Sequence, residues 1–154
     1  MIEPSLINRL KSQHHSITFV IEGLNDQKLS NRYLKDKWSI HEHIAHLGRY
    51  QVVFIDRIQM ILINECPKFE RYNAEQDNGF ASYCARTTSE LLEEINYNRE
   101  VIYSLITTIP VHQLKRDGVH SKFGNLNVVD WTEFFLLHEA HHIYAIFQLR
   151  HTIK

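Results

Sequence analysis

The chain has 154 residues, a formal net charge of −1 and 44% hydrophobic residues. This length fits one compact domain, and the composition provides enough apolar surface for a folded core. The balanced charge excludes the positive field on which sequence-independent nucleic-acid binding depends. We therefore expect a single domain over residues 1–154 with no nucleic-acid partner.

Targeting and membrane-spanning segments are not evident in the sequence. The N-terminus lacks a basic region followed by an apolar run, and no stretch approaches the roughly 18 apolar residues of a membrane span. Cys66 and Cys84 are the only cysteines, and they lack the spacing of a metal motif or disulfide framework. These features predict a soluble protein of the reducing cytoplasm with no membrane partner.

Helical spacing of apolar residues occurs in four segments, whereas five glycines and three prolines are too few for a many-stranded sandwich. The first helix begins at Pro4 and ends near residues 23–25. The second begins with Ser39 in a capping box and ends near Asn64, because Pro67 forbids its extension.

The third helix begins at a second capping-box pattern, residues 87–90, and ends before Pro110. The fourth begins at Asn127 and nearly reaches the C-terminus. We find no β-strand pattern in the three connections. The middle connection, residues 65–86, is too long to join adjacent antiparallel helices, which indicates one crossover. The sequence thus predicts an all-α four-helix bundle with one long crossover connection.

Histidine is unusually frequent, with 11 residues. At about 100° per residue, His138 and His142 fall within the apolar stripe of the fourth helix. That stripe is marked by Val128, Trp131, Phe135, Ile146 and Leu149. Two buried imidazoles one turn apart are unfavourable unless a partner uses their lone pairs. A shared divalent metal is the simplest partner, and two core histidines with separate hydrogen bonds are the alternative.

Residues 138–142 also satisfy the HExxH pattern of zinc proteases. Gln148 stands where a third ligand of that motif would follow, and Ala145 stands where its extended form has glycine. No strand pattern supplies the sheet edge that protease folds present to a peptide. We therefore reject a peptidase and expect the third ligand upstream.

The second helix offers two candidates for this third ligand. His43 lies in the apolar stripe and His46 on its flank, and spacing alone does not choose between them. His14 on the first helix and Tyr50 on the second are candidates to line the same cavity, although His14 could equally be an ordinary core histidine. His112, His120 and His151 are expected to be solvated.

Glu42 and Glu139 are candidate catalytic groups, as bases or as partners that orient a ligand histidine. Glu42 precedes His46 by one turn, and Glu139 follows His138 directly. Each has a structural alternative, since Glu42 completes the capping box and Glu139 borders the buried stripe.

Residues 38–47 (WSIHEHIAHL), together with the FGNL sequence of residues 123–126 and residues 131–142, resemble the DinB-like, or YfiT-like, metal-binding proteins. The resemblance implies an up-down-down-up four-helix bundle, often dimeric, with one ligand from the second helix and two from the last. Carried over by position, the metal ligands are His46, His138 and His142. Ala145 departs from the family, whose members commonly have glutamine there.

Three imidazole ligands leave a metal coordinatively open, as in catalytic sites. Such a site suits activation of water for hydrolysis or ionisation of a thiol for transfer. The resemblance implies a bacterial metal-dependent hydrolase or thiol S-transferase, the latter acting on a low-molecular-weight thiol and an electrophilic small molecule. The metal is expected to be zinc, nickel or iron, all of which imidazole accepts.

The alternative function is a non-catalytic, dimeric metal-binding bundle of the stress response. Val52, Ile55 and Ile63 lie outside the main apolar stripe of the second helix and are candidates for a homodimer interface. Packing beneath the long crossover would also account for them.

Overall fold

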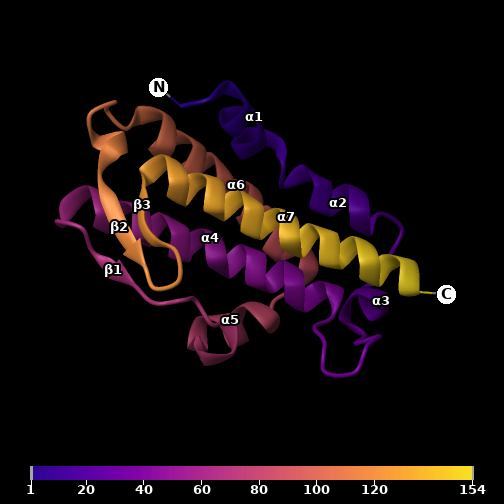
Figure 1. The fold of residues 1–154 in the computed structure, drawn as a ribbon. Helices are drawn as coiled ribbons and strands as arrows, with labels where there is room; N and C mark the ends of the chain where they lie inside the picture. The colour runs from indigo at the N-terminus through magenta and orange to yellow at the C-terminus, as the bar shows by residue number, and fades with distance from the viewer. Residues whose placement is uncertain (1, 154) are drawn as a thin grey trace.

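The computed structural model describes residues 2–153. Four long helical segments form a bundle (Figure 1): α1 (Pro4–Ser12) with α2 (His15–Ile21), then α4 (Ile40–Ile63), α6 (Thr88–Thr108) and α7 (Val128–Thr152). In Figure 1 the first and last segments run from left to right, whereas α4 and α6 run from right to left. The predicted up-down-down-up four-helix bundle is therefore confirmed.

The three long helices after the first begin at capping boxes, in which a side chain and a backbone N–H satisfy each other reciprocally. At α4 the Glu42 N–H donates to Ser39 Oγ at 3.1 Å, and the Ser39 N–H donates to Glu42 Oε2 at 2.7 Å. Thr87 with Glu90 and Asn127 with Asp130 form the other two boxes. The helix starts predicted at Ser39, Thr87 and Asn127 are confirmed.

The first helix is not continuous, which corrects the prediction of one helix from Pro4 to residues 23–25. It breaks between Ser12 and His15. Arg99 of α6 donates from Nη1 to the Leu10 carbonyl oxygen at 3.1 Å, so that this carbonyl bonds a side chain from another helix. A tertiary contact thus accompanies the break, and the apolar periodicity of the segment does not reveal it.

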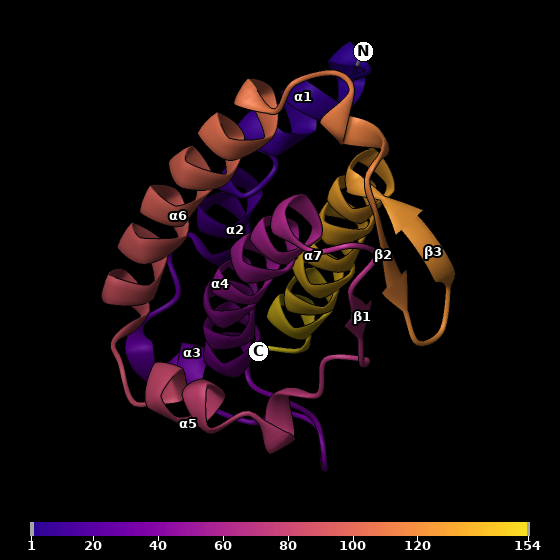
Figure 2. The ribbon, with the colours of Figure 1, turned by 90° about the vertical axis from the view of Figure 1, so that its left-hand side faces the viewer.

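The connections are more ordered than the sequence indicated. Residues 22–39 contain the short helix α3 (Asp26–Ser30), and the crossover contains a 3-10 turn (Ala74–Gln76) and α5 (Asn78–Cys84). Figure 2 shows α5 beneath α4 and α6 at one end of the bundle. The long crossover itself is confirmed between α4 and α6, which run in the same direction.

A small sheet lies outside α7 (Figures 1 and 2), which corrects the prediction that the connections contain no strand. It consists of β1 (Lys68–Phe69), β2 (Asp117–His120) and β3 (Gly124–Asn127). β1 pairs in parallel with β2, and β2 pairs antiparallel with β3. Strands this short carry almost no alternating pattern, and the β1–β2 pair joins two connections that are distant in sequence.

The sheet approaches α4 closely at Gly118. A Cβ atom at this position would lie 2.8 Å from the Phe69 ring and 2.9 Å from the Ile61 side chain, so only glycine fits without a shift. Trp131 of α7, which is fully buried, donates from its indole nitrogen to the Gly118 carbonyl oxygen at 3.3 Å. These contacts hold β2 against both α4 and α7.

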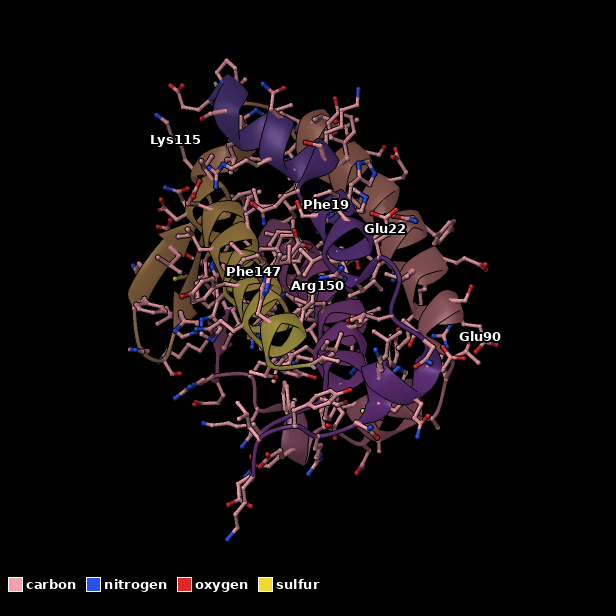
Figure 3. The ribbon with its side chains drawn as sticks, turned by 90° about the vertical axis from the view of Figure 1, so that its right-hand side faces the viewer. Phe19, Glu22, Glu90, Lys115, Phe147 and Arg150 are labelled. Atoms are coloured by element: carbon pink, nitrogen blue, oxygen red, sulfur yellow. The ribbon has the colours of Figure 1, made fainter. Side chains whose placement is uncertain are left out.

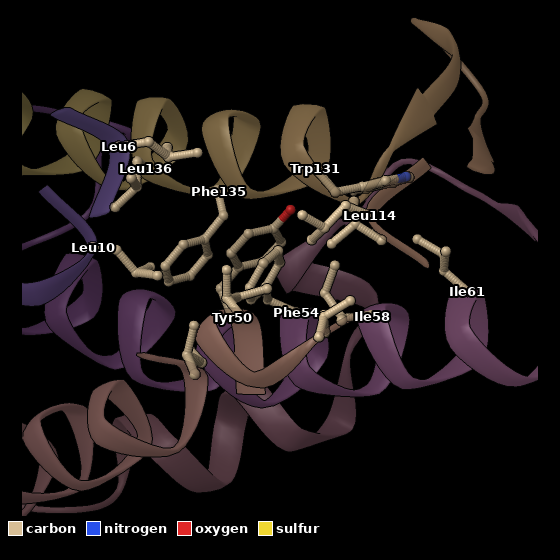
Figure 4. Packing of buried hydrophobic residues seen from close by; sticks show 14 of the residues in the cluster. Leu6, Leu10, Tyr50, Phe54, Ile58, Ile61, Leu114, Trp131, Phe135 and Leu136 are labelled. Atoms are coloured by element: carbon tan, nitrogen blue, oxygen red, sulfur yellow. The ribbon is translucent and has the colours of Figure 1, made fainter. Parts of the chain in front are cut away.

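The apolar core has two parts, one at each end of the bundle. The part at the sheet end includes Leu10, Tyr50, Phe54, Trp131 and Phe135, which lie between α1, α4 and α7 in Figure 4. The other part surrounds α2 and the C-terminal half of α7. Buried polar residues lie near the boundary between the two parts. We call them the central polar layer, which consists of His14, His46, Arg99, Glu139 and His142.

An ion pair between Arg99 and Glu139 joins α6 to α7 within this layer, and both side chains are almost completely buried. Glu139 also accepts a hydrogen bond from Gln13 Nε2 at 3.0 Å. The Arg99 guanidinium lies over the Phe135 ring, 5.0 Å from its centre. The pair therefore connects the broken first helix, α6 and α7.

A second arginine, Arg150 of α7, forms hydrogen bonds with the end of α2 (Figure 3). Arg150 donates from Nη1 to the carbonyl oxygens of Val20 and Glu22, both at 2.7 Å. These bonds satisfy carbonyl groups at a helix end that would otherwise lack partners.

None of the helices within residues 2–153 is long and apolar enough to cross a membrane.

Replacing Glu139 by leucine should lower the free energy of unfolding by about 3–5 kcal/mol, because Arg99 would keep a buried charge without its partner. Urea unfolding monitored by circular dichroism measures this loss. Glu133→Leu is the matched control, since Glu133 pairs with Arg9 at a partly exposed position, where an ion pair contributes about 0–1 kcal/mol. Equal losses in the two variants would contradict a stabilising role of the buried pair.

Candidate metal centre

Three histidines from two antiparallel helices converge where α4 and α7 pack together. His46 comes from α4, and His138 and His142 come from successive turns of α7. One ring nitrogen from each lies within 4.8 Å of the other two, and Nε2 of His46 lies 3.0 Å from Nε2 of His138. The structure thus brings together the three residues that the resemblance implied as ligands.

The three imidazoles are neutral in this environment. Burial, together with repulsion from neighbouring histidines, lowers the pKa of His46 and of His138 to about 3. The same causes lower the pKa of His142 to about 2. Each ring therefore keeps a nitrogen lone pair at neutral pH, which is the form that binds a metal.

This donor set fits a divalent transition metal. Three neutral nitrogen ligands suit zinc, nickel or iron, whereas magnesium and calcium require oxygen ligands. Nδ1 of His46 and Nδ1 of His138 are buried and have no hydrogen-bond partner within residues 2–153. Within the same residues, no fourth histidine, cysteine or carboxylate joins the group. Three protein ligands leave a further position open, as in catalytic zinc sites.

His43, the alternative ligand on α4, lies beside the cluster and is not part of it. Its Nδ1 is 2.9 Å from Nδ1 of His142, so one of these nitrogens donates to the other. The Trp38 ring packs against both, at 5.4 Å from the His43 ring and 6.0 Å from the His142 ring. His43 and Trp38 therefore restrain the orientation of His142.

A cavity of about 710 Å³ opens onto the three histidines. Tyr50 lines it as predicted, with its ring 4.1 Å from the ring of His138. Burial raises the pKa of the Tyr50 phenol to about 12, so the hydroxyl is protonated at neutral pH. The wall also includes Trp38, Tyr72, Phe123, Phe134 and His141. The cavity has the volume and the mixed aromatic and polar lining of a small-molecule site.

His14, the other predicted lining residue, does not line this cavity. It is buried on the first helical segment, and its Nδ1 has no hydrogen-bond partner within residues 2–153. Its position in the central polar layer, where Arg99 acts on it electrostatically, matches the alternative of a core histidine.

The two predicted catalytic glutamates do not line the cavity either. Glu139 lies next to His138 in sequence, but the rotation of about 100° per residue turns it toward α6, where Arg99 binds it. Glu42 caps α4, pairs with Arg32 and lines a separate cleft of about 500 Å³. Glu42 thus completes the capping box, as its structural alternative stated, whereas Glu139 lies within the core as one half of a buried ion pair.

Sequence reasoning missed several residues that line the cavity, and two of them, His120 and Arg57, are buried polar side chains. His120, expected to be solvated, is 3% exposed and lines the cavity. Only the pairing of β1 with β2 brings it there, and no local pattern indicates that pairing. Arg57 also lines the cavity and is buried. An arginine between Phe54 and Ile61 in the apolar stripe of α4 is a signal that the angular reasoning used for the histidines could have found.

The fold and the three-histidine cluster define a four-helix bundle with a candidate metal site, and the sequence matches the DinB superfamily over residues 9–146. The chain belongs to this superfamily. The solved structure of YfiT from Bacillus subtilis superposes with a TM-score of 0.80 at 19% identity, covering 97% of this chain and 88% of YfiT. YfiT is described as a probable metal-dependent hydrolase with an unusual four-helix bundle topology.

Two curated proteins are also similar. "Putative metal-dependent hydrolase OB0413" of Oceanobacillus iheyensis is 24% identical over 139 residues, which cover 89% of this chain and 79% of that protein. The uncharacterized protein YuaE of Bacillus subtilis is 23% identical over 146 residues, with coverages of 87% and 90%.

The buried His14 makes stability depend on pH. Burial and the nearby Arg99 lower its pKa from 6.5 to about 3 in the folded state. The unfolded chain therefore binds an extra proton between these values, and folding stability falls as the pH drops below 6.5. As the pH falls below 6.5, the free energy of unfolding should decrease less steeply in a His14→Gln variant than in the unmodified protein. The difference between the two slopes should approach about 1.4 kcal/mol per pH unit.

Urea unfolding between pH 7.5 and pH 5 measures this difference. His15→Gln is the matched control, because it removes an exposed histidine from the adjacent position. Stability curves of His14→Gln and the unmodified protein that stay parallel across this range would contradict the prediction.

Proposed function

We propose that this chain is a divalent-metal-dependent enzyme whose metal is held by His46, His138 and His142. The observation that carries the proposal is the convergence of three neutral imidazoles on the wall of a cavity large enough for a small molecule. The name of the Oceanobacillus relative and the description of YfiT support the same class, metal-dependent hydrolase.

A bound zinc, nickel or iron ion supplies Lewis acidity, which lowers the pKa of water or of a thiol. The chain contributes the rest of the site. His43 and Trp38 keep the His142 ring in one orientation, and such partners of ligand histidines contribute to metal affinity. Because all three ligands are neutral, they leave the charge of the ion undiminished.

Hydrolysis of a small molecule is the first candidate reaction. Transfer of a low-molecular-weight thiol to an electrophilic small molecule is the second, and it uses the same open position with a thiol in place of water. The cavity wall supports either reaction, because its aromatic side chains exclude bulk water and surround a small organic substrate. A cytoplasmic location belongs to the proposal, and Cys66 and Cys84 are both free thiols, as a reducing compartment would keep them.

Replacing His142 by alanine should abolish metal binding and turnover and leave the bundle folded. The apolar core at both ends does not depend on the metal, so only modest destabilisation is expected. Elemental analysis of protein purified without a metal-affinity tag measures the metal, expected at one ion per chain. Circular dichroism measures the helix content of the variant.

His112→Ala is the matched control, because His112 is exposed. Activity is measured as metal-dependent ester hydrolysis and as transfer of a thiol to an electrophile. Full activity of His142→Ala would contradict metal catalysis. One bound ion without either activity would favour the alternative of a non-catalytic metal-binding bundle.

We also propose that two copies of this chain form a homodimer. Of the three apolar positions named for its interface, Ile63 is 78% exposed, whereas Ile55 packs against the core and Val52 is partly buried. Light scattering at high micromolar concentration should give twice the chain mass of 18.3 kDa. A mass of one chain under these conditions would contradict the dimer.

A further inference from the structure

Arg57 is a buried cation without an anionic partner. Its side chain is 8% exposed, it lines the cavity, and it forms no ion pair within residues 2–153. Nη2 donates to the Glu70 carbonyl oxygen at 2.8 Å, and Nη1 has no hydrogen-bond partner within the same residues. The guanidinium also lies 5.4 Å from the ring centres of both Phe69 and Trp131.

Comparison with Arg99 shows what Arg57 lacks. Arg99 is also buried, but Glu139 neutralises it. A buried charge without a counter-ion is costly, and arginine does not escape this cost by deprotonation. Contacts with aromatic rings and one carbonyl offset part of the cost and leave the charge without a counter-ion. A ligand that enters the cavity could supply the missing anion.

His120 offers a hydrogen-bond donor at the same cavity. Its Nδ1 accepts the backbone N–H groups of Lys122 at 3.0 Å and Phe123 at 3.3 Å. An imidazole nitrogen that accepts carries no proton, so the neutral ring has its proton on Nε2. Nε2 has no partner within residues 2–153, and His120 lines the cavity. The β2–β3 turn thus holds His120 in the tautomer that can donate to a ligand.

The remaining charges at the cavity are mostly positive. Arg71 and Lys122 line it and form no ion pair with the rest of residues 2–153, and Glu75 is the carboxylate among the lining residues. The three ligand histidines are neutral. The cavity therefore presents three cations and one carboxylate to its contents, a balance that favours an anion.

Arg57 and the three histidines lie at different positions along the cavity. Arg57 follows His46 by eleven residues, which corresponds to about 16 Å along α4. Side chains on an α-helix lean back toward its N-terminus, which for α4 is the end that carries His46. Arg57 and the three histidines line the same cavity. A molecule with several heavy atoms could therefore contact both ends.

We propose that Arg57, His120, Arg71 and Lys122 bind a carboxylate group of the substrate, while its reacting group lies at the three histidines. Arg57 and His120 donate hydrogen bonds to the carboxylate oxygens, and the exposed Arg71 and Lys122 attract the anion. The substrate of this site is thus a small carboxylic acid. The position of its reacting group rests on the proposed function, whereas the carboxylate site does not require a metal.

Calorimetric titration with succinate tests the site, and the neutral analogue succinamide is the control ligand. Both are titrated into metal-free protein, after the chelator has been dialysed away, and into zinc-loaded protein. We expect succinate to bind in both states and succinamide to bind at least tenfold more weakly, since charge-assisted hydrogen bonds contribute about 1.5–3 kcal/mol each.

Arg57→Met keeps an unbranched apolar side chain and removes the guanidinium and its charge, and it should weaken succinate binding about tenfold or more without changing succinamide binding. Arg9→Met is the matched control, because Arg9 pairs with Glu133 and does not line the cavity. If Arg57→Met does not fold, the double variant Arg71→Gln/Lys122→Gln tests the carboxylate site instead. Both residues are exposed, so their replacement should not disturb the core. It should weaken succinate binding severalfold.

Equal affinity for succinate and succinamide would overturn the proposal, and so would unchanged succinate binding in a folded Arg57→Met or in the double variant. Succinate binding that disappears when the metal is removed would also overturn it, because the carboxylate would then bind the metal itself. Arg57-dependent binding in a protein that takes up no metal would support this site and contradict the proposed function, so the two can fail separately.

Discussion

The central polar layer is the constraint on which the rest of this bundle depends. Every polar group that helices bring into an apolar core must meet a partner, or its desolvation is uncompensated. Here the layer lies between two apolar clusters, and its two charged members, Arg99 and Glu139, pair from different helices. Arg99 pairs with Glu139 on α7 and thereby neutralises a buried charge. The same side chain donates to the Leu10 carbonyl oxygen on α1, next to the break in the first helix.

Adjacent residues on one turn of α7 contribute to different parts of the structure, the buried ion pair and the histidine cluster. Glu139 and His138 are adjacent in sequence, yet they point about 100° apart, one toward α6 and the other toward α4. The carboxylate is thereby used for structure, and the imidazoles remain free of a negative partner. Burial keeps them neutral, with the pKa of His142 lowered to about 2, so that they are suited to hold a cation.

The connections, which look like simple linkers in the sequence, complete the cavity. The crossover contributes Arg71, Tyr72 and Glu75, and the β2–β3 turn contributes Lys122 and Phe123. The sheet that joins these two connections holds His120 against the bundle, with Gly118 allowing the close approach to α4. The helices therefore carry the candidate metal ligands, and the connecting segments form part of the cavity wall around them.

Local patterns in the sequence determined the three long helices α4, α6 and α7, their capped starts, the crossover and the pairing of His138 with His142, because these depend on spacing along the chain. The choice of His46 over His43 came from family resemblance, since both lie near the same stripe. Only the tertiary structure decided the break at residues 13–14, the burial of His120, the partner of Glu139 and the unpaired charge of Arg57. Each depends on a contact between segments far apart in the chain, for which a single sequence carries no periodic signal.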